Sequence, residues 1–250
     1  NNIKAKGAKL ILFRDEGIFE ITGNIKVEDY LNNLKINSEK IIYSKENSNI
    51  ESIDITKINY KEDFLISGKN ILYDINKKSF VSENKTQITD KFKNQFNLSN
   101  FEFNIEENIF KAQDIDLTDN QQNSLKLKNG YVDLNSNQLI GSDFVVNFQN
   151  SLFGNPENDP RLMGRYIISD KNQSSMKKST FTTCKYKEGK CPSWSISADE
   201  VTHKKDKKRI EYKKAWLEIY DVPVAYFPYF FHPDPTVKRQ SGFLFPQFVN

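Results

Sequence analysis

The stretch IFKAQDIDL, residues 109–117, alternates apolar with polar side chains along the chain. A period of two is typical of a β-strand, because successive side chains of a strand point to opposite faces of a sheet. No window of the sequence sustains the i, i+3, i+4 spacing of apolar residues that predicts a helix. The pattern therefore predicts an all-β protein.

The same pattern recurs every thirty residues over the first 150 residues of the chain. An apolar or aromatic residue stands at five equivalent positions, namely Ile11, Ile41, Ile71, Phe101 and Tyr131. Two residues further on, the series Phe13, Tyr43, Tyr73 and Phe103 follows, and Asp133 breaks it. A polar cluster comes next in each copy, and such clusters favour tight reversals of the chain. Each copy is therefore predicted to be a hairpin of two long, bent strands.

Stacked hairpins predict an elongated antiparallel β structure in which each unit contacts mainly its neighbours. Such a structure has edge strands at its ends, and an edge is either blunted by charge or used for pairing with another chain. Two interpretations of the repeated aromatic residues stay open. They either form a dry core, or they line an apolar groove between two facing sheets that do not quite close.

The composition excludes several classes of function. Lys and Arg number 36 and Asp and Glu number 33, so the net charge of +3 gives no strong basic field for nucleic acid. No run of about 18 apolar residues predicts a membrane-spanning helix. The 250 residues suffice for one large β domain or two ordinary ones. Because the sequence begins at Asn1 and stops within an aromatic segment, we expect it to be a piece of a longer protein.

An enzymatic site finds little support in the sequence. Ser241 stands in Gln240-Ser241-Gly242, which lacks the Gly-x-Ser-x-Gly nucleophile elbow. The chain has two histidines and no Gly-rich phosphate loop. A polysaccharide lyase or hydrolase on a β-solenoid, using Asp, Lys and Tyr, is the enzymatic alternative. We predict no catalytic residue, cofactor or metal site.

The last third of the chain is denser in Pro, aromatic residues and Cys than the repeats. It contains, in this order, DPRLMGRY (159–166), FTTCKY (181–186), PSWSISADEV (192–201), AWLEIYDVPVAYFPYFFHPDP (215–235) and KRQSGFLFP (238–246). This series, from Asp159 to Gln247, resembles the periplasmic part of the LptD family of lipopolysaccharide assembly proteins, also called OstA or Imp. The repeats are similar to the OstA-like modules of the LptA and LptC bridge proteins, for example at residues 22–25, TGNI.

The resemblance implies an open β-jellyroll of two facing, V-shaped sheets over residues 1–221, in the periplasm of a Gram-negative bacterium. Residues 222–250 would form a Pro- and aromatic-rich linker and the start of an outer-membrane β-barrel. An LptA-like bridge protein would add its strand to an edge and deliver lipopolysaccharide, and an LptE-like lipoprotein would bind through the barrel. The acyl chains would pass along the interior. The residues predicted to line this lipid groove are Ile11, Phe13, Ile41, Tyr43, Ile71, Tyr73, Phe101 and Phe103.

The resemblance also implies roles for three prolines. Pro246 would weaken pairing of the first barrel strand at the gate through which the lipid leaves, because proline donates no backbone hydrogen bond. Pro223 and Pro228 would stiffen the linker between groove and barrel. The alternative is that these prolines only mark surface turns.

The two cysteines, Cys184 and Cys191, are near enough in sequence to close their own loop by a disulfide in an oxidising compartment. The alternative is that one or both pair with barrel cysteines outside this chain. A zinc site that adds His203 and His232 to the cysteines matches no standard finger spacing.

Two other functions compete with a non-enzymatic lipid conduit. A free-standing bridge protein of the LptA kind would carry similar repeats, but would not normally end in VPVAYFPYF and KRQSGFLFP. A secreted β-repeat adhesin or structural protein would have a dry repeat interior. We expect the lipid conduit.

Overall fold

The computed structural model describes residues 3–120, 122–149, 157–185, 192–234 and 237. All regular secondary structure in these ranges is β-strand, joined by turns and bends, and no membrane-crossing helix occurs among the described residues. The prediction of an all-β fold is confirmed. By their contacts the residues divide into an amino-terminal unit (Asn1–Asn120 and Asn129–Asn135) and a carboxy-terminal unit (Gln121–Lys128 and Ser136–Asn250).

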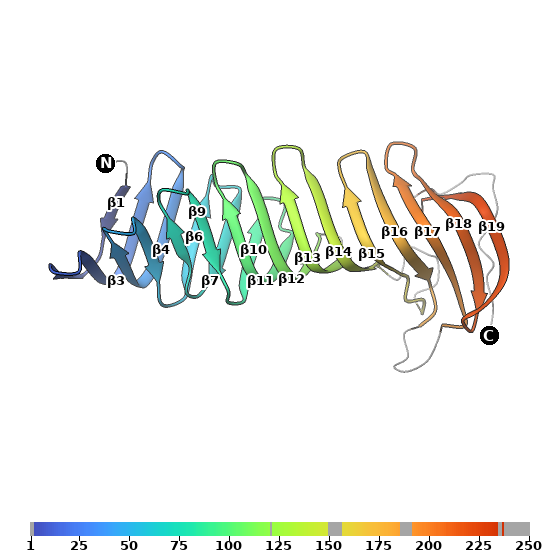
Figure 1. Ribbon diagram of the computed structural model, residues 1–250, viewed down its shortest axis with the longest axis horizontal. Helices are drawn as coiled ribbons and strands as arrows, with labels where there is room; N and C mark the ends of the chain where they lie inside the picture. Colours follow the sequence, from blue (N-terminus) through green and yellow to red (C-terminus); the bar gives the residue numbers. More distant parts are fainter. Residues whose placement is uncertain (1–2, 121, 150–156, 186–191, 235–236, 238–250) are drawn as a thin grey trace. The chain divides into compact units, whose positions relative to one another are not determined.

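The amino-terminal unit consists of two facing antiparallel sheets (Figure 1). Its strands are β1 (Ile3–Lys6), β2 (Lys9–Phe13), β3 (Ile18–Asp29), β4 (Leu34–Ser44), β5 (Asn49–Ser52), β6 (Thr56–Tyr60), β7 (Phe64–Gly68), β8 (Leu72–Asp74), β9 (Ser79–Ser82), β10 (Thr86–Asp90), β11 (Gln95–Asn104) and β12 (Ile109–Thr118). The first sheet runs in the order β1, β3, β4, β6, β7, β10, β11, β12. The second runs β2, β3, β4, β5, β8, β9, β11, β12.

The long strands β3, β4, β11 and β12 belong to both sheets, so the sheets meet where these strands bend. We call this side the corner. At the strand ends away from the corner, the hairpin turns form one row on each sheet, and the two rows face each other. We call the space between these rows the mouth. The predicted hairpins of long, bent strands are therefore present, and their inward faces enclose an interior between the sheets.

The bends have identifiable local causes. Gly23 and Asn24 in β3 have φ angles of 81° and 46°, at a register shift in the pairing with β4. Asn100 in β11, with φ of 47°, lies at a second shift. Positive φ suits Gly and Asn better than other residues, so these residue types allow a strand to turn from one sheet into the other.

In the middle of the unit the chain leaves the strand conformation at the corner, between β5 and β6 and again between β9 and β10. Hydroxyl side chains make hydrogen bonds with the backbone groups that the breaks leave unpaired. Ser52 at the end of β5 accepts a bond from the Ile71 amide at 3.0 Å, and Ser82 at the end of β9 donates to the Lys69 carbonyl at 2.9 Å. Ser52 and Ser82 are thirty residues apart, and each is followed four residues later by a buried threonine, Thr56 or Thr86. Since buried polar groups need partners, this Ser-x-x-x-Thr repeat stabilises the breaks.

The carboxy-terminal unit is an antiparallel meander in which each strand pairs with the next along the chain. Its strands are β14 (Gln138–Asn147), β15 (Arg161–Ser169), β16 (Gln173–Thr182), β17 (Trp194–Lys204), β18 (Arg209–Ile219) and β19 (Val222–Pro233), preceded by β13 (Ser124–Asp133), which the two units share. Left-handed residues recur in mid-strand at Asp143, Lys178 and Lys214, with φ angles of 48°, 51° and 51°. The strand pairings are interrupted at the same positions.

Candidate functional site

The interior of the amino-terminal unit is lined by aliphatic and aromatic side chains from both sheets. Five of the eight predicted groove residues are buried there, with exposed fractions of at most 3%, namely Ile41, Ile71, Tyr73, Phe101 and Phe103. Further buried side chains join them, namely Ile25, Val27, Leu34, Ile36, Ile50, Ile58, Tyr60, Ile66, Phe80, Ile88, Leu98, Ala112 and Ile115. The thirty-residue pattern predicts which residues share a face but not which face is inward, and burial places these five on the inward face.

Aromatic rings pack against one another inside this unit. Tyr73 stacks on Phe80 with ring centroids 4.6 Å apart, and Phe101 stacks on Phe110 at 5.8 Å. The rings of Phe103 and Tyr60 pack edge to face, with centroids 5.1 Å apart. The Tyr73–Phe80 and Phe101–Phe110 contacts join neighbouring strands of one sheet, whereas the Tyr60–Phe103 contact joins the two sheets, so an acyl chain between the sheets would have to separate that pair.

The remaining three predicted groove residues lie towards the amino-terminal end of the unit. Ile11 and Tyr43 are half-buried, and Phe13 is 42% exposed. Tyr43 packs against Phe19 at 5.7 Å. Phe13 lies on β2, which pairs only with β3 among the described residues, so this end of the second sheet is an edge. Whether any of the eight residues contacts lipid stays a prediction.

Two tyrosine hydroxyls reach across the mouth, and sequence reasoning did not identify this role. Tyr73 lies beside a turn of the second sheet, and its hydroxyl donates to Oδ2 of Asp29, which lies beside a turn of the first sheet, at 2.9 Å. Tyr60, on the first sheet, donates to Asn108 Oδ1 in a turn of the second at 3.2 Å. Burial raises the pKa of Tyr73 far above its ordinary value, and the bond to Asp29 raises it further, so Tyr73 remains a donor.

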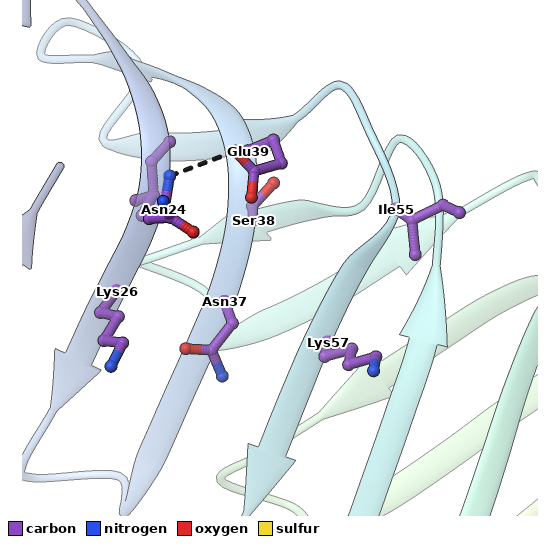
Figure 2. A pocket seen from close by; sticks show the side chains of 8 residues that line it. Asn24, Lys26, Asn37, Ser38, Glu39, Ile55 and Lys57 are labelled. Carbon is purple, nitrogen blue, oxygen red and sulfur yellow. Dashed lines mark hydrogen bonds between the residues drawn. The ribbon is translucent and has the colours of Figure 1, made fainter. Parts of the chain in front are cut away.

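A polar depression of about 210 Å³ lies near the corner, outside the interior (Figure 2). It is lined by Asn24, Ile25, Lys26, Asn37, Ser38, Glu39, Ile55 and Lys57. Six of these side chains are exposed, and Glu39 Oε2 accepts a bond from the Asn24 amide at 3.2 Å. The depression can offer amide and ammonium donors to solvent, but it does not join the predicted groove residues.

The predicted cysteine and histidine sites lie in the carboxy-terminal unit. Cys184 is half-buried with Sγ 3.7 Å from the Trp194 carbonyl, and Cys191 lies outside the described residues, so the disulfide stays a prediction. His203 Nε2 lies 2.6 Å from Asp234 Oδ2, and His232 Nε2 lies 3.1 Å from the Tyr212 hydroxyl. In the part of the chain that the structure describes, no three potential metal ligands gather in one place.

The prolines of the predicted linker lie within a strand. Pro223 and Pro228 are both in β19, which pairs with β18 along most of its length. Pro228 lies opposite the interruption at Lys214, and Pro223 lies at a register shift. Proline is tolerated there because it removes a donor where regular pairing is already broken. Pro246 lies outside the described residues, and the division at residues 221 and 222 stays a prediction.

The chain is similar to several LPS-assembly proteins. The chain is 42% identical over 69 residues to the LPS-assembly protein LptD of Methylococcus capsulatus. It is 37% identical over 82 residues to LptD of Pseudoalteromonas translucida, and 29% identical over 122 residues to LptD of Idiomarina loihiensis. The chain is LptD-like. These matches cover 28%, 33% and 47% of the chain, and the resemblance drawn from its motifs is confirmed.

The LptD-like chain spans only a small part of these relatives, namely 6%, 10% and 14% of their lengths. The chain matches no protein-family model. Among solved structures, it is similar to LptH of Pseudomonas aeruginosa, described as the LptA homologous periplasmic component of a lipopolysaccharide transport device. That likeness has a TM-score of 0.40 and 15% identity, and it covers 44% of this chain and 81% of LptH.

Two of the motifs that carry the resemblance, at residues 159–166 and 181–185, meet in the carboxy-terminal unit. Arg161 in β15 is 8% exposed, and its Nη1 donates to the Cys184 carbonyl at 2.6 Å. The same nitrogen lies 3.3 Å from Asp159 Oδ2. A buried guanidinium needs a charged partner and further acceptors, and these two residues supply them. Arg161 therefore ties the first motif to the chain beside the first cysteine.

Proposed function

We propose that this chain is the periplasmic part of a protein that delivers lipopolysaccharide to the outer membrane. The acyl chains travel between the two sheets of the amino-terminal unit. The observation that carries the proposal is the continuous set of inward apolar and aromatic side chains in an LptD-like chain. Each methylene left in water costs about 0.8 kcal/mol, so a lipid with several acyl chains needs a long apolar surface. The phosphorylated head group can stay in solvent outside the mouth.

Edge-strand addition of an LptA-like bridge protein is the proposed route of delivery, and β2 is the edge that suits it. Three of its side chains are large, apolar and more than 40% exposed, namely Leu10, Leu12 and Phe13. β2 has one lysine, Lys9 at its start, whereas the neighbouring edge, β1, has two among four residues, Lys4 and Lys6. Charged edges resist pairing and apolar edges permit it. The proposal also includes an outer-membrane barrel that follows the described strands and an LptE-like lipoprotein that binds through this barrel.

Photo-crosslinking during transport tests the proposed lipid path. A photoreactive amino acid is placed at Tyr43, Tyr73 or Phe103 in the full-length protein, and at the outward Lys57 as the matched control. We expect lipopolysaccharide adducts at interior positions and none at Lys57. Absence of adducts at all three interior positions would contradict the lipid path. It would favour the dry core of a structural β-repeat protein, which the ring contacts in the interior also permit.

A further inference from the structure

The mouth of the amino-terminal unit is crossed by side chains from both rows of turns. Asp29 precedes the turn that joins β3 to β4 in the first sheet, and Tyr73 precedes the turn that joins β8 to β9 in the second. Tyr60 and Asn108 are the corresponding pair further along the unit. The two tyrosines come from opposite sheets, so the contacts cross the mouth in both directions.

The Asp29 carboxylate is held by its own turn and by one side chain from the facing sheet. Its Oδ1 accepts bonds from the Leu31 and Asn32 amides at 3.1 and 3.2 Å. Its Oδ2 accepts from the Asn32 side chain at 2.7 Å and from the Tyr73 hydroxyl at 2.9 Å. The Tyr73 hydroxyl also accepts a bond from the Asn32 side chain at 3.3 Å, so separation of the sheets would break both bonds of this hydroxyl and leave the three bonds within the turn intact.

The second crossing has the same character. Tyr60 donates to Asn108 Oδ1 at 3.2 Å, with the Ile105 carbonyl 3.5 Å away as a further acceptor. Lys61 Nζ, from the same turn as Tyr60, lies 3.5 Å from Asn108 Oδ1. Both crossings consist of hydrogen bonds between polar side chains. Water or a polar head group can therefore replace each bond when the sheets part.

We propose that the Tyr73–Asp29 and Tyr60–Asn108 hydrogen bonds form a seam that holds the mouth closed and that must open before an acyl chain enters the interior. This proposal rests on the proposed function and adds a step to it. The closed seam keeps the apolar interior out of water while no lipid is present. Each crossing consists of a few side-chain hydrogen bonds around one tyrosine hydroxyl, so the mouth can open without unfolding of either hairpin.

The test uses the double variant Tyr60→Phe/Tyr73→Phe, which removes both hydroxyls and leaves both rings in place. Tyr43→Phe is the matched control within the unit, because no hydrogen bond of the Tyr43 hydroxyl occurs among the described residues. Tyr212→Phe is the control for loss of a buried tyrosine bond in the other unit. Urea unfolding identifies any variant that loses overall stability.

Hydrogen exchange of the lipid-free protein measures opening directly. We expect amides in residues 29–33 and 71–75 to exchange about three- to tenfold faster per lost hydrogen bond in the double variant. Both controls should leave these segments at the wild-type rate. Unchanged exchange in the double variant would overturn the seam.

Association of fluorescently labelled lipopolysaccharide measures the consequence for entry. We expect the double variant to associate faster than wild type, whereas a hydroxyl with only a structural role would not accelerate binding. Faster exchange with an unchanged association rate would overturn the gating step and leave the lipid path standing. Failure of every protein, wild type included, to bind lipopolysaccharide would refute the proposed function, while exchange would still decide the seam.

Discussion

Gly164 in β15 stands where two strands approach closely. A Cβ atom there would lie 2.7 Å from Phe144 Cε1 and 2.7 Å from Ser179 Oγ. Gly164→Ala should lower the free energy of unfolding by about 1–3 kcal/mol, because the phenyl ring must move in a packed interior. Urea unfolding measures this change, and the neighbouring exposed Arg165→Ala should alter stability by less than about 0.5 kcal/mol. Equal stability of Gly164→Ala and wild type would contradict the close packing.

His232 should make the carboxy-terminal unit less stable in acid. Its Nδ1 lies 2.7 Å from the Pro233 carbonyl, which can only accept, so Nδ1 carries the proton and Nε2 accepts from Tyr212. Burial lowers the pKa of His232, although the Asp234 carboxylate opposes the shift and His203 adds to it. The folded protein therefore binds this proton less readily than the unfolded chain. Stability attributable to His232 falls as pH drops below its unfolded pKa of about 6.5.

The variant His232→Gln removes this titration and keeps an acceptor for Tyr212. Between pH 7 and pH 5, wild type should lose stability more steeply than the variant, by at most about 1.4 kcal/mol per pH unit. Urea unfolding across this range gives both slopes. The His203–Asp234 pair, which interacts electrostatically with His232, is retained in both proteins. Identical slopes would show that His232 does not titrate differently on folding.

Asp133 illustrates what the residue pattern could and could not predict. The thirty-residue register places it with the aromatic series, yet its Oδ1 accepts a bond from the Asn135 amide at 2.8 Å and so caps a turn. Asn104 caps the preceding turn of the same row by bonding the Glu106 and Glu107 amides. These two capping residues are 29 residues apart, so the register slips by one between copies. A fixed period of thirty residues cannot reveal that one copy is a residue shorter. The turn in that copy shifts the register by one, and a shift of one residue exchanges the inward and outward side chains.

At the scale of the strand, β2 should be the edge that binds an LptA-like bridge protein. Leu12→Lys places a charge on this edge and should weaken binding of the purified bridge protein at least about tenfold, because a charged edge resists pairing. Ala5→Lys, on the exposed neighbouring edge β1, is the matched control and should leave the affinity unchanged. The dissociation constant is measured by titration. The reverse result would assign docking to β1.

The broken strands explain a second limit of sequence reasoning. Ile25 and Ile55 are thirty residues apart, yet Ile25 is 1% exposed and Ile55 is 59% exposed. Ile25 lies within β3, whereas Ile55 lies in the break between β5 and β6. Alternation of apolar residues predicted the strands, since it follows from the period of a strand, but it did not say which face is inward. It could not predict where a strand breaks, since that depends on hydroxyl bonds from distant strands.

In the aromatic strand β19, the prolines also made the position of a strand hard to predict from the sequence. Five prolines within residues 223–246 predict a connection, because proline interrupts a ladder. The structure nevertheless pairs residues 222–233 with β18, and the ring of Tyr212 stacks on Phe230 at 4.4 Å. Among the described residues β19 pairs with β18, and a strand paired on one side needs donors on that side only, so proline is tolerated where the neighbouring strand also bends. The tyrosine bonds across the mouth had no sequence signal at all, since they join residues 44 and 48 positions apart.

At the scale of the whole molecule, the order of the strands has a consequence for how the protein folds. In the carboxy-terminal unit every described strand pairing joins neighbours along the chain, from β14 to β19. The contact order is therefore low for an all-β structure, and low contact order goes with fast folding. Each hairpin can form on the one made before it, as soon as its own residues are available. A chain that becomes available amino-terminus first can thus fold while its later residues are still to come.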